Sequence, residues 1–159
     1  MLLAVLTISD RCSQGLLTDT AGPAVVALLR QAWPQAEFWT GLLPDEEGRI
    51  EATLEQLSGQ GASLVLTVGG TGLGPRDHTP EATRRVIDRE APGLAEAMRA
   101  LGALTNPFAW LSRGVAGLKG ATLIVNLPGS RRGAEQSLAS ILTLIQHGLD
   151  VAGGGQTHP

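Results

Sequence analysis

The sequence contains little cysteine, little lysine and little charge of either sign. Cys12 is the only cysteine among the 159 residues, so no internal disulfide can form, which suits a reducing compartment. Charged residues make up 17% of the chain and the formal net charge is −3, so nothing in the composition calls for a nucleic-acid or an anionic-membrane partner. A chain with so little charge has less surface to keep solvated, which favours association into an oligomer.

Segments typical of other protein classes are also missing. No apolar stretch approaches the roughly 20 residues of a membrane span. The apolar N-terminus has neither the basic segment nor the cleavage pattern of a signal peptide, and no His/Cys spacing indicates a zinc site. We therefore expect a cytoplasmic protein without a membrane or nucleic-acid partner, and the length of the chain fits one domain.

Apolar runs alternate with helical patterns along the chain. Four runs predict buried strands, at Leu2–Ile8, Glu37–Leu43, Ser63–Val68 and Ala121–Leu127. Apolar residues at helical spacing predict helices capped by Thr20 up to about Trp33, around Ile50–Leu57, and after Ser130 up to about Asp150. Thr79-Pro80-Glu81, a cap followed by proline, predicts a helix up to about Asp88, and another helix is expected from Pro92. The alternation predicts an α/β domain over residues 1–150, with a mainly parallel sheet covered on both faces. A flexible tail is expected at 151–159, because its consecutive glycines cannot hold a helix.

Polar loops follow all four predicted strands. Ser9-Asp10-Arg11 ends the first strand, Asp45 follows the second, Gly69–Pro75 follows the third and Pro128-Gly129-Ser130 follows the last. The carboxyl ends of parallel strands lie at one edge of a sheet, where ligands of such folds bind. These four loops are therefore expected to share one site.

The loop after the third strand contains most of the candidate chemistry. Amides in Gly69–Pro75 can form a nest for an anion. The segment lacks the Gly-Lys-[Ser/Thr] of a P-loop and the spacing of the dinucleotide fingerprint, and on its own it is also typical of a tight turn. Arg76 and the helix start at Thr79-Pro80-Glu81 can engage phosphate oxygens, and Asp77 suits a divalent cation.

Plainer interpretations exist for each charged candidate. Asp77 can cap a turn while Arg76 is solvated. Asp45 stands in a Pro-Asp-Glu-Glu segment, which is a common way to load the first turn of a helix with negative charge. Arg113 has the pattern of a surface arginine at the end of a helix. The residues alone leave these alternatives open.

Taken together, these segments resemble the MoaB/Mog family of molybdopterin adenylyltransferases, which is related to the small domains of gephyrin and of a plant cofactor-synthesis protein. The matching stretches are TISDR at Thr7–Arg11, LLPDE at Leu42–Glu46, LVLTVGGTGLGPRDHTPEAT at Leu64–Thr83, LSR at Leu111–Arg113 and LIVNLPGS at Leu123–Ser130. They occur in family order and cover nearly the whole chain. One departure is Arg131-Arg132, where relatives usually carry Pro-Lys.

The resemblance implies a single-domain, three-layer α/β/α sandwich, the molybdopterin-binding fold, that associates as a homotrimer or a hexamer. It implies ATP as co-substrate, Mg²⁺ as the metal, molybdopterin as the acceptor and a molybdenum-insertion protein as a further partner. Asp45 and Asp77 match the family's two catalytic aspartates and are expected to hold the metal.

The resemblance also assigns two sets of binding residues. Those expected to bind the nucleotide and its phosphates are Ser9, Asp10, Arg11, Gly69, Gly70, Thr71, Gly72, Arg76, Thr79, Pro80 and Glu81. Those expected to bind molybdopterin are Ser112, Arg113, Asn126, Pro128, Gly129 and Ser130.

Three rival functions stay open at this point. The first is a trimer that binds and carries molybdopterin without adenylating it, although a carrier has no use for the carboxylate pair. The second is a phosphate-cleft protein for another pterin or nucleotide. The third is molybdenum insertion, which is performed by larger multidomain chains. Pyrophosphate release from ATP that depends on added pterin would separate the first rival from the enzyme.

Overall fold

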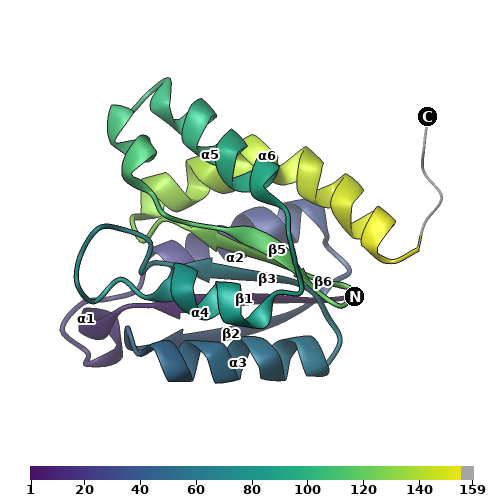
Figure 1. Cartoon of the computed structure of the whole chain (residues 1–159), viewed down its shortest axis with the longest axis horizontal. Helices are drawn as coiled ribbons and strands as arrows, with labels where there is room; N and C mark the ends of the chain where they lie inside the picture. Colours follow the sequence, from purple (N-terminus) through teal and green to yellow (C-terminus); the bar gives the residue numbers. More distant parts are fainter. Residues whose placement is uncertain (155–159) are drawn as a thin grey trace.

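Four parallel strands form the centre of the computed structural model, which describes residues 1–154 (Figure 1). They are β1 (Leu2–Ile8), β2 (Glu37–Leu43), β3 (Ala62–Val68) and β6 (Thr122–Leu127). The order in the six-stranded sheet is β2-β1-β3-β6-β5-β4, and each of the neighbouring pairs from β2 to β6 is parallel. The predicted strands and the mainly parallel sheet are thus confirmed, with shifts of one residue at the starts of β3 and β6.

Two short antiparallel strands complete the sheet and were not predicted. They are β5 (Ala116–Lys119), which pairs with β6, and β4 (Arg89–Glu90), which pairs with β5. A two-residue strand is too short to show periodicity, and Gly117 makes β5 resemble a loop. The glycine is required by close approach, because a Cβ there would lie 2.6 Å from the Arg89 carbonyl oxygen.

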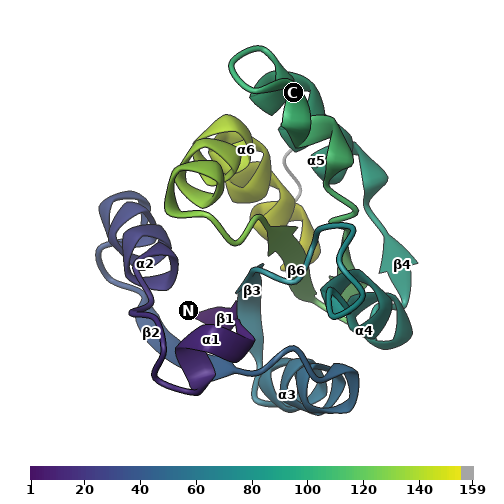
Figure 2. The same cartoon turned by 90° about the vertical axis from the view of Figure 1, so that its left-hand side faces the viewer.

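Helices cover both faces of the sheet, as Figure 2 shows. On one face lie α2 (Ala21–Ala32) and α6 (Arg131–Ala152), with α5 (Pro92–Ala103) packed beside α6; on the other lie α3 (Glu47–Gly59) and α4 (Thr79–Val86). This arrangement is the predicted three-layer sandwich. Within residues 1–154, no helix combines the length and the apolar character that a membrane crossing would need.

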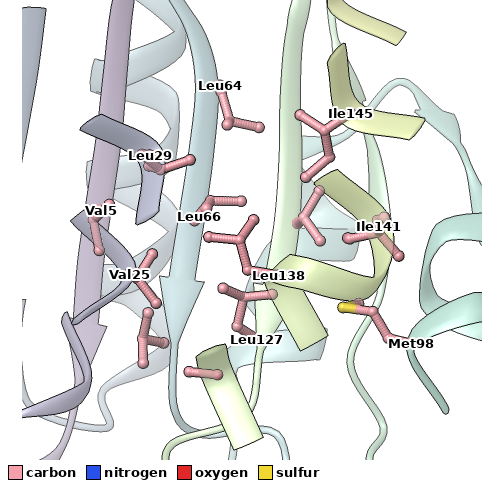
Figure 3. Close-up of a cluster of buried hydrophobic side chains, with 14 of the residues drawn as sticks. Val5, Val25, Leu29, Leu64, Leu66, Met98, Leu127, Leu138, Ile141 and Ile145 are labelled. Atoms are coloured by element: carbon pink, nitrogen blue, oxygen red, sulfur yellow. The ribbon is translucent and has the colours of Figure 1, made fainter. Parts of the chain in front are cut away.

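Each face of the sheet has its own hydrophobic core. Leu64 and Leu66 of β3 meet Leu29 of α2 and Leu138 of α6, and all four side chains are fully buried (Figure 3). The opposite core is built on Ile50, Leu54 and Leu57, the helical repeat noted in the sequence. Each such side chain contributes about 1.5–3 kcal/mol of transfer free energy, so the two cores hold the four central strands and their loops in register.

The helix termini differ from prediction at two caps. Thr20 is at the N-cap position of α2 as predicted, but its side chain makes no capping hydrogen bond; Asp19 Oδ1 instead accepts from the amides of Ala21 (3.1 Å) and Gly22 (3.0 Å). Thr79 is the first residue of α4 instead of its cap, and α4 ends at Val86. The short helices α1 (Asp10–Ser13) and η1 (Pro107–Leu111) were not predicted, since a single turn has no sequence period.

The C-terminal helix runs slightly further than expected. It ends at Ala152, and Gly154 adopts a positive φ of 83° that terminates it. The tail predicted for 151–159 thus begins inside the helix, and residues 155–159 lie outside the described residues.

Candidate active site

Two adjoining cavities open at the carboxyl edge of the sheet, the edge that faces the viewer in Figure 2. The first cavity, of about 520 Å³, is lined by residues 7–12, 17–21, Asp45, 68–70, Asp77, Gly129 and Ser130. The second cavity, of about 350 Å³, is lined by 70–72, Asp77, Gly102, Asn106, 108–109, 111–112, 128–130, Gly133 and 136–137. Gly70, Asp77, Gly129 and Ser130 belong to both. The loops after β1, β2, β3 and β6 therefore meet in one place, as predicted.

The sequence-predicted residues divide between the two cavities. The first contains Ser9, Asp10, Arg11, Asp45 and Gly69 from the predicted nucleotide and metal sets. The second contains Thr71, Gly72, Ser112 and Pro128, together with the four shared residues. Six predicted residues line neither cavity: Arg76, Thr79, Pro80, Glu81, Arg113 and Asn126.

The carboxylates of Asp10 and Asp45 each accept a hydrogen bond from the other residue's backbone amide. The amide of Asp10 donates to Asp45 Oδ2 (2.9 Å), and the amide of Asp45 donates to Asp10 Oδ1 (3.0 Å). Arg76 then donates from Nε and Nη2 to the two carboxylate oxygens of Asp10, at 3.0 Å each. The hydrogen bonds from Arg76 and from the Asp45 amide hold the pKa of Asp10 below its usual value. Asp10 and Arg76 therefore tie together the loops after β1, β2 and β3.

Asp45 is in the opposite electrostatic situation. Burial raises the pKa of its carboxyl above the usual value, and the negative charges of Asp10 and Asp77 raise it further. The hydrogen bond from the Asp10 amide and the charge of Arg76 oppose these effects without cancelling them. An ionised Asp45 beside Asp77 is thus unfavourable on its own, and a cation placed between them would relieve the repulsion.

The glycine loop brings Asp77 back to the same cavity. The amide of Gly74 donates to Asp77 Oδ2 (2.8 Å), and the amide of Asp77 donates to the Gly74 carbonyl (3.1 Å). Gly70 has a φ of 64°, and a Cβ there would lie 2.2 Å from Thr79 Oγ1 and 3.0 Å from Asp45 Oδ1. Only glycine fits at this point, where the loop passes between α4 and the carboxylate of Asp45.

The carboxylates of Asp45 and Asp77 could bind a Mg²⁺ ion whose other ligands come from a substrate. Asp45 Oδ1 and Asp77 Oδ1 accept no hydrogen bond from residues 1–154, so each keeps a free oxygen ligand. The same residues contain no group of three or more His, Cys, Asp or Glu side chains able to enclose a metal. Mg²⁺ typically takes one or two carboxylates, waters and substrate phosphates, which matches two free carboxylate oxygens.

Arg113 is engaged by the protein. Its Nε donates to the Gly72 carbonyl (2.7 Å), one terminal nitrogen donates to the Asp77 carbonyl (2.5 Å) and the other pairs with Glu81. Burial would raise the pKa of Glu81, but the hydrogen bond and the charge of Arg113, together with a backbone hydrogen bond and the charge of Arg84, lower it overall. The predicted contact between Arg113 and molybdopterin stays untested.

Asn126 lies in the interior of the protein. Its Nδ2 donates to Thr67 Oγ1 and Thr83 Oγ1, both at 2.9 Å, while its Oδ1 accepts from the Val115 amide (3.1 Å). The residue is 1% exposed. The structure therefore gives Asn126 the role of joining β3, β6 and α4, in place of the predicted contact with a ligand.

Sequence reasoning missed several residues that line the cavities. Asp19 lines the first cavity, where its Oδ2 accepts a hydrogen bond from Thr7 Oγ1 (2.7 Å). Asn106 and Phe108 line the second cavity from the segment around η1. Asn106-Pro107, where η1 begins, is a dipeptide typical of turns, but nothing in the sequence indicates that this turn reaches the carboxyl edge.

Known proteins match this chain over most of its length. The family described as "Probable molybdopterin binding domain" matches residues 4–147. The molybdopterin adenylyltransferase of Haemophilus influenzae is 42% identical over 141 residues, which are 87% of this chain and 72% of that protein. The molybdenum cofactor synthesis protein cinnamon of Drosophila melanogaster is 37% identical over 150 residues, or 94% of this chain, but the match spans only 25% of cinnamon.

The solved structure of the molybdopterin biosynthesis enzyme MoaB from Thermus thermophilus has the same fold. The two structures superpose with a TM-score of 0.89 at 46% sequence identity, and the match covers 96% of each chain.

Proposed function

The chain belongs to the family of probable molybdopterin-binding domains, and we propose that it is a molybdopterin adenylyltransferase of molybdenum cofactor biosynthesis. It transfers the adenylyl group of ATP to the terminal phosphate of molybdopterin, giving adenylyl-molybdopterin and pyrophosphate. The observation that carries the proposal is the meeting of Asp45 and Asp77 in one cavity beside a glycine loop.

The reaction needs little acid–base chemistry. The terminal phosphate of molybdopterin is already anionic at neutral pH, so it attacks the α-phosphorus of ATP without a general base. The obstacle is the repulsion between two anions, which enzymes overcome by positioning the reactants and neutralising charge. A site for this reaction therefore requires cation-holding carboxylates and backbone donors more than it requires a histidine.

The residues at the carboxyl edge fit these requirements. Asp45 and Asp77 would hold Mg²⁺, which when bound offsets the charge of the triphosphate and of the leaving pyrophosphate. The amides of Gly70, Thr71 and Gly72 cradle the triphosphate, whereas the Gly69 amide donates to the Leu127 carbonyl (3.1 Å). Ser130, whose Oγ caps α6 by accepting from the Gly133 amide (3.1 Å), places that helix N-terminus at both cavities, where it favours a phosphate.

Most of the predicted ligand residues support a division of the site, although Thr71 and Gly72 of the nucleotide set line the second cavity. The first cavity, with Ser9, Asp10 and Arg11, takes the nucleotide, and the second cavity, with Ser112 and Pro128, takes molybdopterin. Because the two cavities share Asp77 and Ser130, the acceptor phosphate and the α-phosphorus can meet at their common wall.

The same proposal covers assembly and location. The chain acts in the cytoplasm as a homotrimer, with a hexamer as the alternative, and passes its product to a molybdenum-insertion protein. The low charge of the chain and its exposed apolar side chains support self-association. Three of these side chains are Leu104, Phe108 and Trp110, which are 81%, 72% and 60% exposed.

The experiment is the pair of substitutions Asp45→Asn and Asp77→Asn. Asparagine keeps an acceptor for the amides of Asp10 and Gly74 but removes the negative charge. Each variant should lose roughly 100-fold or more in pterin-dependent pyrophosphate release from ATP and Mg²⁺, while still binding molybdopterin. Asp88→Asn, the same change at the opposite edge of the sheet, should keep the wild-type rate.

Two results would overturn the proposal. If Asp77→Asn turned over at a near-normal rate with ATP and Mg²⁺, the metal-holding role would be wrong. If the wild-type protein bound molybdopterin and released no pyrophosphate, the chain would be a carrier.

A further inference from the structure

Arg113 connects the loop of residues 69–78, between β3 and α4, to the first turn of α4, and it contacts three carbonyl groups of that loop. Its backbone amide donates to the Thr71 carbonyl (2.9 Å), and its guanidinium donates to the carbonyls of Gly72 and Asp77 and pairs with Glu81. These contacts lie at the beginning and the end of the loop. Between them the loop is exposed, as the 67% exposure of Leu73 shows. A single residue thus holds both ends of the segment that carries Asp77.

We propose that Arg113, oriented by Glu81, is a positioning residue that fixes Asp77 opposite Asp45 and aims the loop amides at the substrate. The proposal rests on the proposed function, because it concerns the same metal and phosphate site. Neither Arg113 nor Glu81 lines either cavity, so both act through the loop and not by touching the substrate.

Peptide geometry links each carbonyl to the direction of the amide that follows it. In a trans peptide the C=O and the following N–H point in opposite directions. Holding the carbonyls of Thr71 and Gly72 on Arg113 therefore turns the amides of Gly72 and Leu73 away from it. Within residues 1–154 these two amides donate no backbone hydrogen bond, so they are free for phosphate oxygens.

An arginine side chain has the geometry needed to contact the carbonyls of Gly72 and Asp77 and the carboxylate of Glu81 together. A planar guanidinium presents five N–H donors in fixed directions, so it can reach two carbonyls and a carboxylate at once. Lysine carries the same charge on a single nitrogen and cannot span the three acceptors together. Glu81 supplies the full negative charge that the two carbonyls lack, and it holds the guanidinium from the first turn of α4.

A purely structural role makes different predictions. The side chains of Arg113 and Glu81 are 34% and 37% exposed, and ion pairs exposed to this degree add little stability. Arg85 offers a matched control, because it lies on the same helix as Glu81 and pairs with Glu47 and Glu51 away from the cavities. Loss of either pair should change the melting temperature similarly, whereas only the Arg113 pair should change the site.

The experiment compares Arg113→Gln, Arg113→Lys and Glu81→Gln with Arg85→Gln. Mn²⁺ binding is measured by electron paramagnetic resonance with a non-hydrolysable ATP analogue, and adenylyl transfer gives kcat and the KM for molybdopterin. Arg113→Gln should weaken Mn²⁺ binding and lower kcat by roughly 10-fold each, with the KM for molybdopterin within about 2-fold. Arg113→Lys and Glu81→Gln should lie between it and the wild type, and Arg85→Gln should match the wild type.

Hydrogen exchange of the amides in residues 70–77 provides a readout that needs no turnover. Exchange should be faster in Arg113→Gln than in Arg85→Gln. Unchanged Mn²⁺ affinity with a raised KM for molybdopterin would overturn the proposal in favour of direct contact between Arg113 and the acceptor. Unchanged exchange in Arg113→Gln would also overturn it. A wild-type protein without adenylyl transfer would instead refute the proposed function, and the exchange comparison would still decide whether Arg113 holds the loop.

Discussion

The two edges of the parallel sheet hold cavities of similar size, but they differ in how the protein compensates the charges of the carboxylates that line them. At the amino edge, a cavity of about 470 Å³ is lined by Glu55, Asp88 and Lys119. Lys119 Nζ lies 3.4 Å from Asp88 and 3.5 Å from Glu55, and the Gly120 amide donates to Asp88 Oδ2 (2.8 Å). At the carboxyl edge, Asp45 and Asp77 line the same cavity, and each has one carboxylate oxygen that accepts no hydrogen bond from residues 1–154. Cavity size therefore does not distinguish the candidate site, whereas uncompensated charge does.

The pKa values express the same contrast. The Gly120 amide lowers the pKa of Asp88, with help from the charge of Lys119. Burial raises the pKa of Asp45, with help from Asp10 and Asp77. The amino edge compensates the charge of Asp88 within the protein, whereas the carboxyl edge leaves that of Asp45 for a ligand, as functional sites commonly do.

The largest expected effect compares two glycines with positive φ, one at each edge. Gly70→Ala should slow adenylyl transfer by roughly 100-fold or more, because the new Cβ would displace Thr79 and Asp45. Gly120→Ala has a similar φ of 57° and open space around its Cβ, so it should cost only about 1 kcal/mol of stability and leave the rate unchanged. Equal rates in the two variants, measured by pyrophosphate release, would show that the carboxyl edge is no more important for turnover than the amino edge.

The next largest effect is expected on the stability of the metal-free protein when Asp45 or Asp88 is replaced. In EDTA at pH 7, Asp45→Asn should slightly raise the free energy of urea unfolding, since it removes an unfavourable charge from a partly buried position. Asp88→Asn should lower that free energy, since it removes a favourable charge. A loss of stability in Asp45→Asn would show that its carboxylate is compensated within the protein.

The pH dependence of these two variants should also have opposite signs. Asp45 binds its proton more tightly in the folded state, so its unfavourable contribution grows as pH rises through its raised pKa and vanishes below the ordinary value of 3.8. Asp88 has a lowered pKa, so its favourable contribution is complete above 3.8 and is lost as pH falls through the folded value. Urea titrations between acid and neutral pH would measure both differences against the wild type.

The smallest expected effect is Lys119→Gln. Its two ion pairs are partly exposed, so their loss should cost less than about 1 kcal/mol of stability and leave adenylyl transfer unchanged. A large fall in turnover would show that the amino edge contributes to function and would require a new account of that cavity.

The sequence predicted the fold well where the signal was periodic. Long apolar runs identified β1, β2, β3 and β6, apolar residues at helical spacing identified α2, α3 and α6, and prolines at helix starts identified α4 and α5. Strand β4, strand β5, helix α1 and helix η1 escaped because each is too short to show a period. Their positions depend on pairing with distant segments, which no local pattern contains.

By itself, the sequence determined which chemical groups stand at the ends of the parallel strands, and hence that Asp45, Asp77 and a glycine loop would meet at one edge. Only the tertiary structure decided which of the neighbouring candidates face the cavities. Asn126 turned inward and Arg113 turned toward the loop carbonyls, because each found its hydrogen-bond partners on segments far away in the chain. Strand ends follow from local pattern, but side-chain direction follows from the partners that packing supplies.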